Sequence, residues 1–228
     1  MNENEIVTKW NNRLRGTRIV VRDDQLIREC VGKKVLHLGC TDSPFTQEKL
    51  DNGTALHPKL ESVASQIVGV DIDSSALATL GSLCKKTDLI CCDIESPILL
   101  DKLSGREFDV VVCADVIEHL NNPGAMLGNL VKAMQPGSKL IITTINALAI
   151  KLVLRALFAR EAVHPDHVAY YSFATLKHLC ERFGISVEDE IKTFLYPFNN
   201  RFLTAVQPPF YRLFPNVADG IIVTATRL

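Results

Sequence analysis

The sequence predicts an α/β fold in which helices cover both faces of a mainly parallel sheet. Apolar segments rich in β-branched residues alternate with helical patterns from about residue 30 to residue 145. The apolar segments carry few polar residues, which is typical of strands that are buried on both faces. Strands and helices that alternate in this way predict a doubly wound sheet with right-handed crossovers. With 228 residues, the chain is expected to form a single domain over 1–228.

The first two thirds of the chain contain five expected strands and three expected helices. The strands cover 34–38, 66–70, 88–92, 108–113 and 139–144, and the helices cover 57–65, 74–84 and 122–134. Ser74 is the expected N-cap of the second helix, and the turn sequence QPGS, which contains Gly137, ends the third helix.

The last third of the chain departs from this alternation. Helices are expected over 146–161 and 172–183, and strands over 185–195 and 220–227. No crossover pattern separates the two strands, so they predict an antiparallel hairpin that closes the sheet. We also expect residues 1–30 to form a helical lid segment, and residues 146–216 to add lid and substrate-side structure.

Composition narrows the classes of function. The net charge of −1 and the absence of a basic stripe argue against nucleic-acid binding. The seven cysteines form no CxxC pair and several lie in apolar runs, which is typical of a reducing compartment. The N-terminus is polar, and no apolar run reaches the roughly 18 to 20 residues that span a bilayer. We therefore expect a cytoplasmic protein without a transmembrane segment.

Successive expected strands end in residues that suit a nucleoside-type ligand. Gly39 follows the first strand and lets a ligand approach the backbone. Asp71 follows the second strand, and its carboxylate can accept hydrogen bonds from both hydroxyls of a ribose. Asp93 follows the third strand and can accept from an exocyclic amine, beside the backbone N–H of Ile94. Because the carboxyl ends of parallel strands meet at one edge of a sheet, these residues predict one ligand site.

The motifs VLHLGC, VGVDID, CCDIE, FDVVVCADVIEHL and MQPGSKLIITT resemble those of the class I S-adenosylmethionine-dependent methyltransferases. The resemblance covers about residues 33–145. It implies a Rossmann-like seven-stranded sheet in the order 3-2-1-4-5-7-6, with the last strand antiparallel. It also implies S-adenosyl-L-methionine as the cofactor, with the following binding residues: His37, Gly39, Asp71, Ile72, Asp93, Ile94, Ala114 and Asp115.

A nicotinamide-dependent dehydrogenase is the main competing interpretation of this fold. Such an enzyme needs G-x-G-x-x-G after the first strand, and here Gly39 is followed by no suitable glycine. The methyltransferase family itself usually has an acidic residue at the position of His37 and glycines at those of Thr41 and Ser43. His37 is therefore either a direct ligand contact or a strand residue with one ring nitrogen satisfied internally. The segment TQEKLDNGTALHPKL, which holds His57, also lengthens the interval between Gly39 and the second strand.

The sequence ADVIEHL, residues 114–120, contains the main candidates for chemistry. Helical spacing would place Asp115, Glu118 and His119 on one face. In one hypothesis, Glu118 and His119 only hydrogen-bond the start of a helix. In a second, His119 is a general base for a substrate hydroxyl. In the third, a divalent metal such as Mg²⁺ lowers the pKa of that hydroxyl and positions it.

The metal hypothesis draws on the same family resemblance. Members that methylate quinone-precursor catechols or RNA ends show Glu-x-x-Glu-His where this chain has Asp-x-x-Glu-His. The RNA-end enzymes have a further histidine in a segment like PDHVAYYS, which holds His167 here, with His164 nearby. The resemblance therefore implies Asp115, Glu118, His119 and His167 as metal ligands, and His119 and His167 as catalytic residues.

The expected activity is methyl transfer from S-adenosylmethionine to a small molecule or a glycan, most simply to oxygen. The sulfonium is already activated, so in-line placement of the acceptor supplies most of the catalysis. Trp10, Arg13 and Tyr170 or Tyr171 are candidates for the substrate side. The alternative is a non-catalytic protein of the same fold that acts as a sensor or a partner subunit.

An amphipathic segment over 147–160 suggests a contact surface. Lys151, Arg155 and Arg160 lie on an otherwise apolar helix. This pattern fits a lid helix packed on the sheet, a homodimer face or a helix that lies on a membrane surface.

Overall fold

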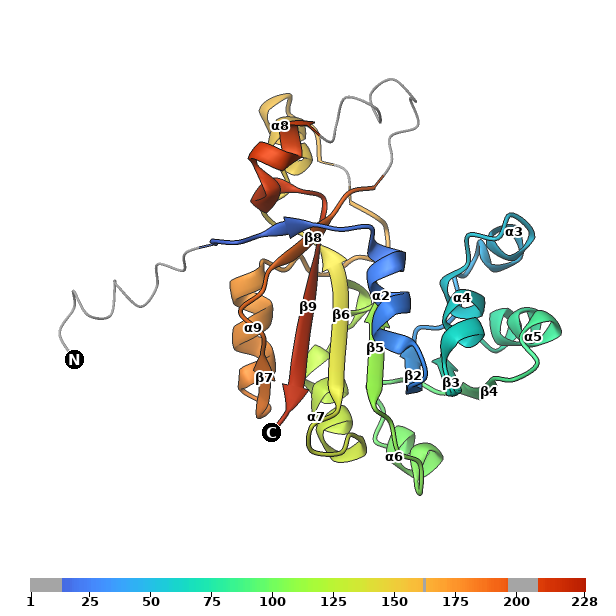
Figure 1. Ribbon diagram of the computed structural model, residues 1–228. Helices are drawn as coiled ribbons and strands as arrows, with labels where there is room; N and C mark the ends of the chain where they lie inside the picture. Colours follow the sequence, from blue (N-terminus) through green and yellow to red (C-terminus); the bar gives the residue numbers. More distant parts are fainter. Residues whose placement is uncertain (1–13, 162, 197–208) are drawn as a thin grey trace.

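A nine-stranded sheet runs through the molecule, with helices on both of its faces (Figure 1). The structure is a computed structural model that describes residues 14–161, 163–196 and 209–228. The expected substrate-side residues Trp10 and Arg13 lie outside the described residues, as do parts of the expected lid segments 1–30 and 146–216.

The sheet contains the predicted strand order, although the described residues form nine strands and not the seven that were expected. Its spatial order is β4 (Asp88–Cys91), β3 (Gln66–Asp71), β2 (Lys34–Leu38), β5 (Val110–Ala114), β6 (Lys139–Ile145), β9 (Gly220–Arg227), β8 (Lys192–Phe194) and β1 (Arg18–Ile19), and β7 (Ile185–Val187) also pairs with β9. The strands from β4 to β6 are parallel, and β9 is antiparallel to β6, β7 and β8. The C-terminal strand therefore inserts antiparallel, as predicted.

The edge of the sheet beyond β9 differs in detail from the prediction. The single strand expected over 185–195 is two short strands, β7 and β8, that pair with different parts of β9. β1 was not expected, and it extends the edge by pairing in parallel with β8.

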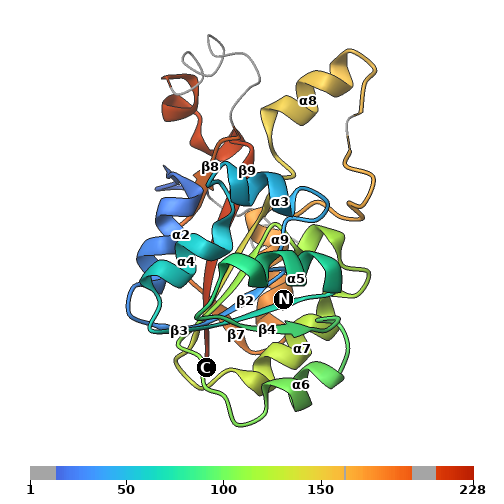
Figure 2. The same ribbon diagram turned by 90° about the vertical axis from the view of Figure 1, so that its right-hand side faces the viewer.

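The alternation of side chains along β2 divides the core into two layers. Leu36 and Leu38 pack in a cluster that includes buried residues of α6 (Ile98–Leu103), α7 (Pro123–Ala133) and α9 (Phe173–Glu181). Val35 packs in a second cluster, with buried residues of α2 (Arg22–Cys30) and α4 (Leu56–Val63). Figure 2 shows these helices on either side of the strands. His37 has the same parity as Val35, so its side chain lies on the face of α2 and α4.

The helices at the ligand edge differ from the predictions in three places. α5 (Ser74–Leu83) is capped by Asp73 and not by Ser74, because the Asp73 carboxylate accepts hydrogen bonds from the backbone N–H groups of Ser75 and Ala76. The segment inserted after Gly39 forms α3 (Thr46–Asp51) as well as the start of α4. The helix expected over 146–161 is shorter, α8 (Ile150–Leu157).

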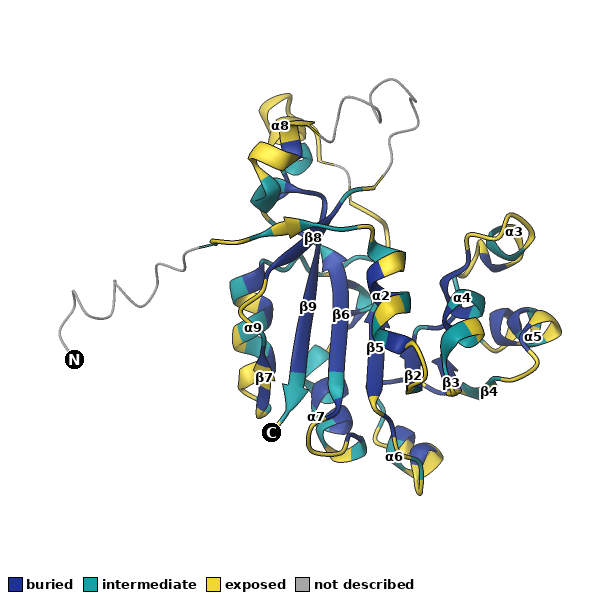
Figure 3. Ribbon diagram, in the orientation of Figure 1, coloured by how far each residue is buried: buried dark blue, intermediate teal, exposed yellow. Residues whose placement is uncertain are grey.

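α8 stands away from the sheet, and none of its residues is buried (Figure 3). Leu157 and Phe158 are 73% and 77% exposed at its end. Lys151 of α8 forms an ion pair of 2.6 Å with Asp219. A contact of 147–160 with a second copy or a membrane surface stays a prediction. Within the described part of the chain, no helix combines the length and the apolar character needed to cross a bilayer.

Candidate functional site

The register of three neighbouring strands builds the edge at which the candidate site lies. Leu38 of β2 pairs with Val70 of β3 on one side and with Cys113 of β5 on the other. The next residues in the chain are Gly39, which follows β2, and Asp71 and Ala114, which are the last residues of β3 and β5, so these three lie side by side at the edge of the sheet. Their side chains and backbone therefore face the same volume beyond the sheet edge.

Gly39 is required by its surroundings as well as by its backbone angle. Its φ is +62°, and a Cβ atom at this position would lie 2.2 Å from Cγ2 of Val116. The N–H groups of Gly39 and Cys40 both donate to the carbonyl of Val70, at 2.8 and 3.2 Å. The turn after β2 is therefore held tightly against β3, and only glycine fits at its first position.

A cleft of about 580 Å³ opens at this edge of the sheet. It is lined by every residue that the sequence assigned to the cofactor: His37, Gly39, Asp71, Ile72, Asp93, Ile94, Ala114 and Asp115. The same cleft is lined by Arg22, which was not predicted, and by His119, His164 and His167. The expected cofactor residues and the expected catalytic histidines thus share one cavity.

Thr41 and Ser43, which stand where the resembling family has glycines, hold the loop to the neighbouring carboxylates. Oδ2 of Asp71 accepts from the backbone N–H of Thr41 at 3.0 Å and from its hydroxyl at 2.8 Å. Oδ1 of Asp71 accepts from the N–H of Asp73 at 3.0 Å. The hydroxyl of Ser43 donates to Oδ2 of Asp73 at 2.7 Å, and this bond lowers the pKa of Asp73. Oδ2 of Asp71 therefore receives two hydrogen bonds and Oδ1 receives one, so Oδ1 retains a lone pair for a ligand hydroxyl.

The turn that carries Asp93 and Ile94 is supported from α7. Asp93 is exposed at the cleft, and one of its carboxylate oxygens accepts from the N–H of Glu95 at 2.8 Å. The amide of Asn129 donates to the carbonyls of Ile94 and Ser96, at 3.1 and 2.9 Å. Asn129 was not identified from the sequence, where it is one polar position within an amphipathic helix.

Asp115 does not share a helix face with Glu118 and His119, so that prediction is wrong. Its φ is +54°, a strained value for a residue with a side chain, and the following turn is a short 3₁₀ helix, Ile117–His119. The carboxylate of Asp115 forms an ion pair with Arg22 and accepts from the hydroxyl of Thr143 at 2.8 Å. Burial lowers the pKa of Arg22, but the nearby carboxylates, Asp115 first, outweigh it and raise that pKa overall.

The carboxylate of Glu118 is buried against Thr144 of β6. The side chain is 1% exposed and accepts from the hydroxyl of Thr144 at 2.9 Å. Burial, followed by the charge of Asp115, raises the pKa of Glu118 to about 7. The backbone carbonyl of Glu118 accepts from the N–H groups of Val168 and Ala169, at 2.9 and 3.3 Å. These two bonds attach the loop of residues 164–169 to the 3₁₀ helix.

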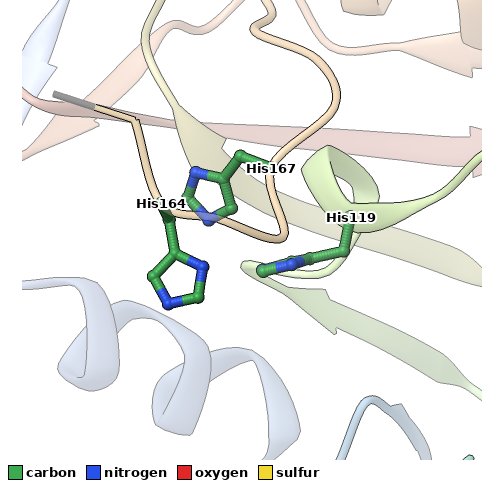
Figure 4. A group of neighbouring side chains, drawn as sticks. All are labelled: His119, His164 and His167. Carbon is green, nitrogen blue, oxygen red and sulfur yellow. The ribbon is translucent and has the colours of Figure 1, made fainter. Parts of the chain in front are cut away.

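The attached loop brings His164 and His167 against His119 (Figure 4). The ring centroids of His119 and His167 are 4.5 Å apart, and those of His164 and His167 are 4.9 Å apart. Each of the three residues offers one ligand atom such that all three atoms lie within 4.8 Å of one another. Nδ1 of His167 is buried and has no hydrogen-bond partner among the described residues. We call these three residues the histidine cluster.

The histidine cluster differs from the metal set that the sequence predicted. His119 and His167 are in it, and His164 joins them. Asp115 and Glu118 are not among its members in the described part of the chain, because Arg22, Thr143 and Thr144 hold their carboxylates elsewhere. The cluster can bind a cation through nitrogen alone, or it can accept a proton.

Separate from the histidine cluster, His37 and His57 form a buried pair at the cleft. Nδ1 of His37 and Nδ1 of His57 are 2.9 Å apart, and the rings are stacked with an interplanar angle of 6°. The residues are 2% and 1% exposed. Burial, followed by the neighbouring His57, lowers the pKa of His37 well below its ordinary value. Burial lowers the pKa of His57 to about 4. One ring nitrogen of His37 is thus satisfied internally, while the residue also lines the cleft.

Comparisons with known proteins agree with this architecture. A family model described as a methyltransferase domain matches residues 24–190. The ubiquinone biosynthesis O-methyltransferase of Idiomarina loihiensis is 32% identical over 119 residues, which cover 50% of this chain and 43% of the relative. The enzyme of the same name from Coxiella burnetii is 26% identical over 182 residues, which cover 75% and 71%. The match thus spans about half the length of the first relatives, including that of Methylococcus capsulatus at 50%.

Solved structures share the fold at low sequence identity. A SAM-dependent methyltransferase from Archaeoglobus fulgidus has a TM-score of 0.59 and 18% identity, and the match covers 90% of this chain and 91% of that one. Magnesium protoporphyrin IX methyltransferase from Synechocystis with bound SAH has a TM-score of 0.57 and 15% identity, over 91% of this chain and 82% of that one. At this identity the likeness shows the fold alone.

The buried histidine pair predicts a loss of stability in mild acid. In the unfolded chain both rings take up protons below about pH 6.5, whereas His57 in the folded protein does so only near pH 4. The free energy of unfolding should therefore fall as the pH drops through this interval, by about 3 kcal/mol from His57. In urea unfolding experiments, the free energy of unfolding of the double variant His37→Leu/His57→Leu should fall less between pH 7 and 4.5 than that of the wild type. His178→Leu, at an exposed histidine, should keep the wild-type slope. If the free energy of unfolding depends on pH equally in all three proteins, the loss of stability in acid does not come from the buried histidine pair.

Proposed function

The chain belongs to the family described as a methyltransferase domain, and from this premise we propose that it transfers the methyl group of S-adenosyl-L-methionine to a hydroxyl oxygen of a small molecule or a glycan. One observation carries the proposal. The cleft at the carboxyl ends of the parallel strands joins Gly39, Asp71 and Asp93 to the histidine cluster. A cofactor held by the first group would lie in the same cavity as groups that can activate a hydroxyl.

The positions of the polar groups support a nucleoside in the cleft. Oδ1 of Asp71 keeps a lone pair for a ribose hydroxyl, although Thr41 and Asp73 already donate to the carboxylate. Asp93 is exposed and available to the exocyclic amine of adenine, with Ile94 next to it. Gly39 lets the amino-acid part of the cofactor approach the backbone after β2.

An oxygen acceptor is supported by the relatives and by the histidine cluster. The curated relatives are named as O-methyltransferases of ubiquinone biosynthesis. A hydroxyl must lose its proton as it accepts a methyl group, and a neutral imidazole with a free lone pair can take that proton. His119 and His167 are our candidates for this base. Placement of the hydroxyl in line with the sulfonium would supply most of the rate acceleration.

The histidine cluster also fits a divalent metal. Its three nitrogens converge, and Nδ1 of His167 is buried without a partner among the described residues. A set of three imidazoles resembles the three-ligand sites of catalytic zinc, whereas Mg²⁺ prefers oxygen ligands. We therefore propose that His119, His164 and His167 would hold Zn²⁺ or a similar ion in preference to Mg²⁺. When bound, such an ion lowers the pKa of a hydroxyl and orients it.

The structure gives no specific support to a non-catalytic role. That alternative rests on the glycines missing from the loop after β2. The bonds that Thr41 and Ser43 make to Asp71 and Asp73 give these replacements a structural role, and the cleft remains open beside them.

Cofactor binding can be tested by calorimetry with S-adenosylmethionine and with S-adenosylhomocysteine. The wild type should bind both. Asp93→Ala should weaken binding about tenfold or more, because the exocyclic amine of adenine loses the carboxylate that accepts its hydrogen bond. Asp101→Ala, at an exposed carboxylate on α6, is the matched control and should bind as the wild type does. A wild type that binds neither compound, or an Asp93→Ala variant with unchanged affinity, would contradict the proposed pose.

Metal binding can be tested without a known substrate. Titration of the chelator-treated protein with Zn²⁺ should give one tight site per chain, and Mg²⁺ at the same concentration should not compete. His164→Ala should lose this site, whereas His178→Ala, outside the cluster, should retain it. If His164→Ala and the wild type bind Zn²⁺ equally, the cluster is not the metal site. The base hypothesis then remains, and it predicts methyl transfer that a chelator does not inhibit.

A further inference from the structure

The buried histidine pair is the middle of a hydrogen-bond chain that runs from the cleft to the surface. Nδ1 of His37 meets Nδ1 of His57 at 2.9 Å, and Nε2 of His57 meets the hydroxyl of Thr87 at 3.1 Å. The hydroxyl of Thr87 donates to Oε1 of Glu61 at 2.7 Å, and the backbone N–H of Lys86 donates to the same oxygen at 2.9 Å. Of these residues, His37 lines the cleft, and Thr87 and Glu61 do not.

The chemistry of each group sets the direction of the chain. An ionised carboxylate only accepts, so the single proton of the Thr87 hydroxyl goes to Glu61. Thr87 must then accept from His57, which places the proton of the neutral His57 ring on Nε2 and leaves Nδ1 as an acceptor. His37 must therefore donate from Nδ1. Because a neutral imidazole carries one N–H, Nε2 of His37 is left with a free lone pair.

The neighbouring residues make room for this pair and keep it uncharged. Gly69 of β3 lies next to His37 in the sheet, and a Cβ atom there would lie 2.9 Å from Cε1 of His57. The missing side chain at position 69 thus provides the space that the His57 ring occupies. Both rings are almost fully buried, which disfavours their protonated forms. A proton on Nδ1 of His57 would also break the alternation of donor and acceptor between the two rings.

We propose that His57 is a positioning residue that acts through His37: the chain of Glu61, Thr87 and His57 holds His37 as the Nδ1–H tautomer, so that its Nε2 accepts a hydrogen bond from an N–H donor of the ligand in the cleft. This inference rests on the proposed function. The ligand group that Nε2 of His37 would bind is the ammonium of the cofactor's amino-acid part, which brings N–H donors and a positive charge. A neutral acceptor suits that group, whereas an Nε2–H or a protonated ring would repel it.

The tautomer can be measured directly in the ligand-free protein. Long-range ¹H–¹⁵N correlation spectra distinguish a protonated from an unprotonated ring nitrogen in each histidine. His37 should show a protonated Nδ1 and an unprotonated Nε2, and His57 should show the opposite tautomer. A proton on Nε2 of His37 in the wild type would overturn the inference. This spectrum requires no ligand and no substitution of the pair beyond those used for assignment.

A remote variant tests whether the chain matters for binding. Thr87→Val removes the hydroxyl at a position outside the cleft, so His37 should become a mixture of tautomers. Its affinity for S-adenosylhomocysteine should fall by about threefold to tenfold, in line with the loss of one hydrogen bond. Thr79→Val is the control, since among the described residues the hydroxyl of Thr79 bonds only to the carbonyl of Ser75. Both the spectrum and the affinity of this variant should match those of the wild type.

The outcomes separate this inference from the proposed function. A folded Thr87→Val protein with the wild-type tautomer and the wild-type affinity would overturn the inference and leave the proposed function standing. A wild type that binds no S-adenosylhomocysteine would overturn the proposed function, and with it the role of His37 toward the cofactor. If Thr87→Val loses both the wild-type tautomer of His37 and affinity for S-adenosylhomocysteine, the result supports the inference and the proposed function together.

Discussion

The parallel register of β2 with β3 and β5 is the constraint on which the rest of the site depends. It sets Leu38 level with Val70 and Cys113, so that Gly39, Asp71 and Ala114 lie side by side at the edge of the sheet. A shift of one residue would turn every side chain of the shifted strand to the opposite face and would move Asp71 out of line with Gly39 and Ala114. Gly39 then allows the chain to turn back against Val116 without a clash. The cleft exists because these three strand ends are level.

The half of the cleft that can carry chemistry depends on one backbone group. The carbonyl of Glu118 holds the N–H groups of Val168 and Ala169, and these bonds place His164 and His167 against His119. One ion pair, between Asp115 and Arg22, and two hydrogen bonds hold the acidic side chains away from that place. The hydroxyls of Thr143 and Thr144 donate these two bonds to Asp115 and Glu118. The result is a nitrogen-only cluster beside a site suited to a cationic cofactor, in a chain of almost no net charge.

The strands, and the residues that line the cleft at their ends, could be predicted because they follow from local pattern. Apolar runs locate the strands, and a residue directly after a buried parallel strand must lie at the ligand edge. The histidine cluster could be predicted only in part. Helical spacing assumed a helix from Asp115, but the positive φ of that residue ends the regularity on which the spacing depends. Arg22 pairs with Asp115 across 93 positions, and no local pattern indicates such a contact. The roles of Thr41 and His57 likewise require the neighbouring strand and helix to be in place.

The central claim is that one cleft brings a nucleoside-bound sulfonium next to the histidine cluster. A crystal structure of the protein with S-adenosylhomocysteine tests it most directly. We predict the adenine at Asp93 and Ile94, a ribose hydroxyl on Asp71, and the sulfur on the side of the cleft that holds His119, His164 and His167. A ligand bound outside this cleft would contradict the account, as would a ligand whose sulfur faces away from the three histidines.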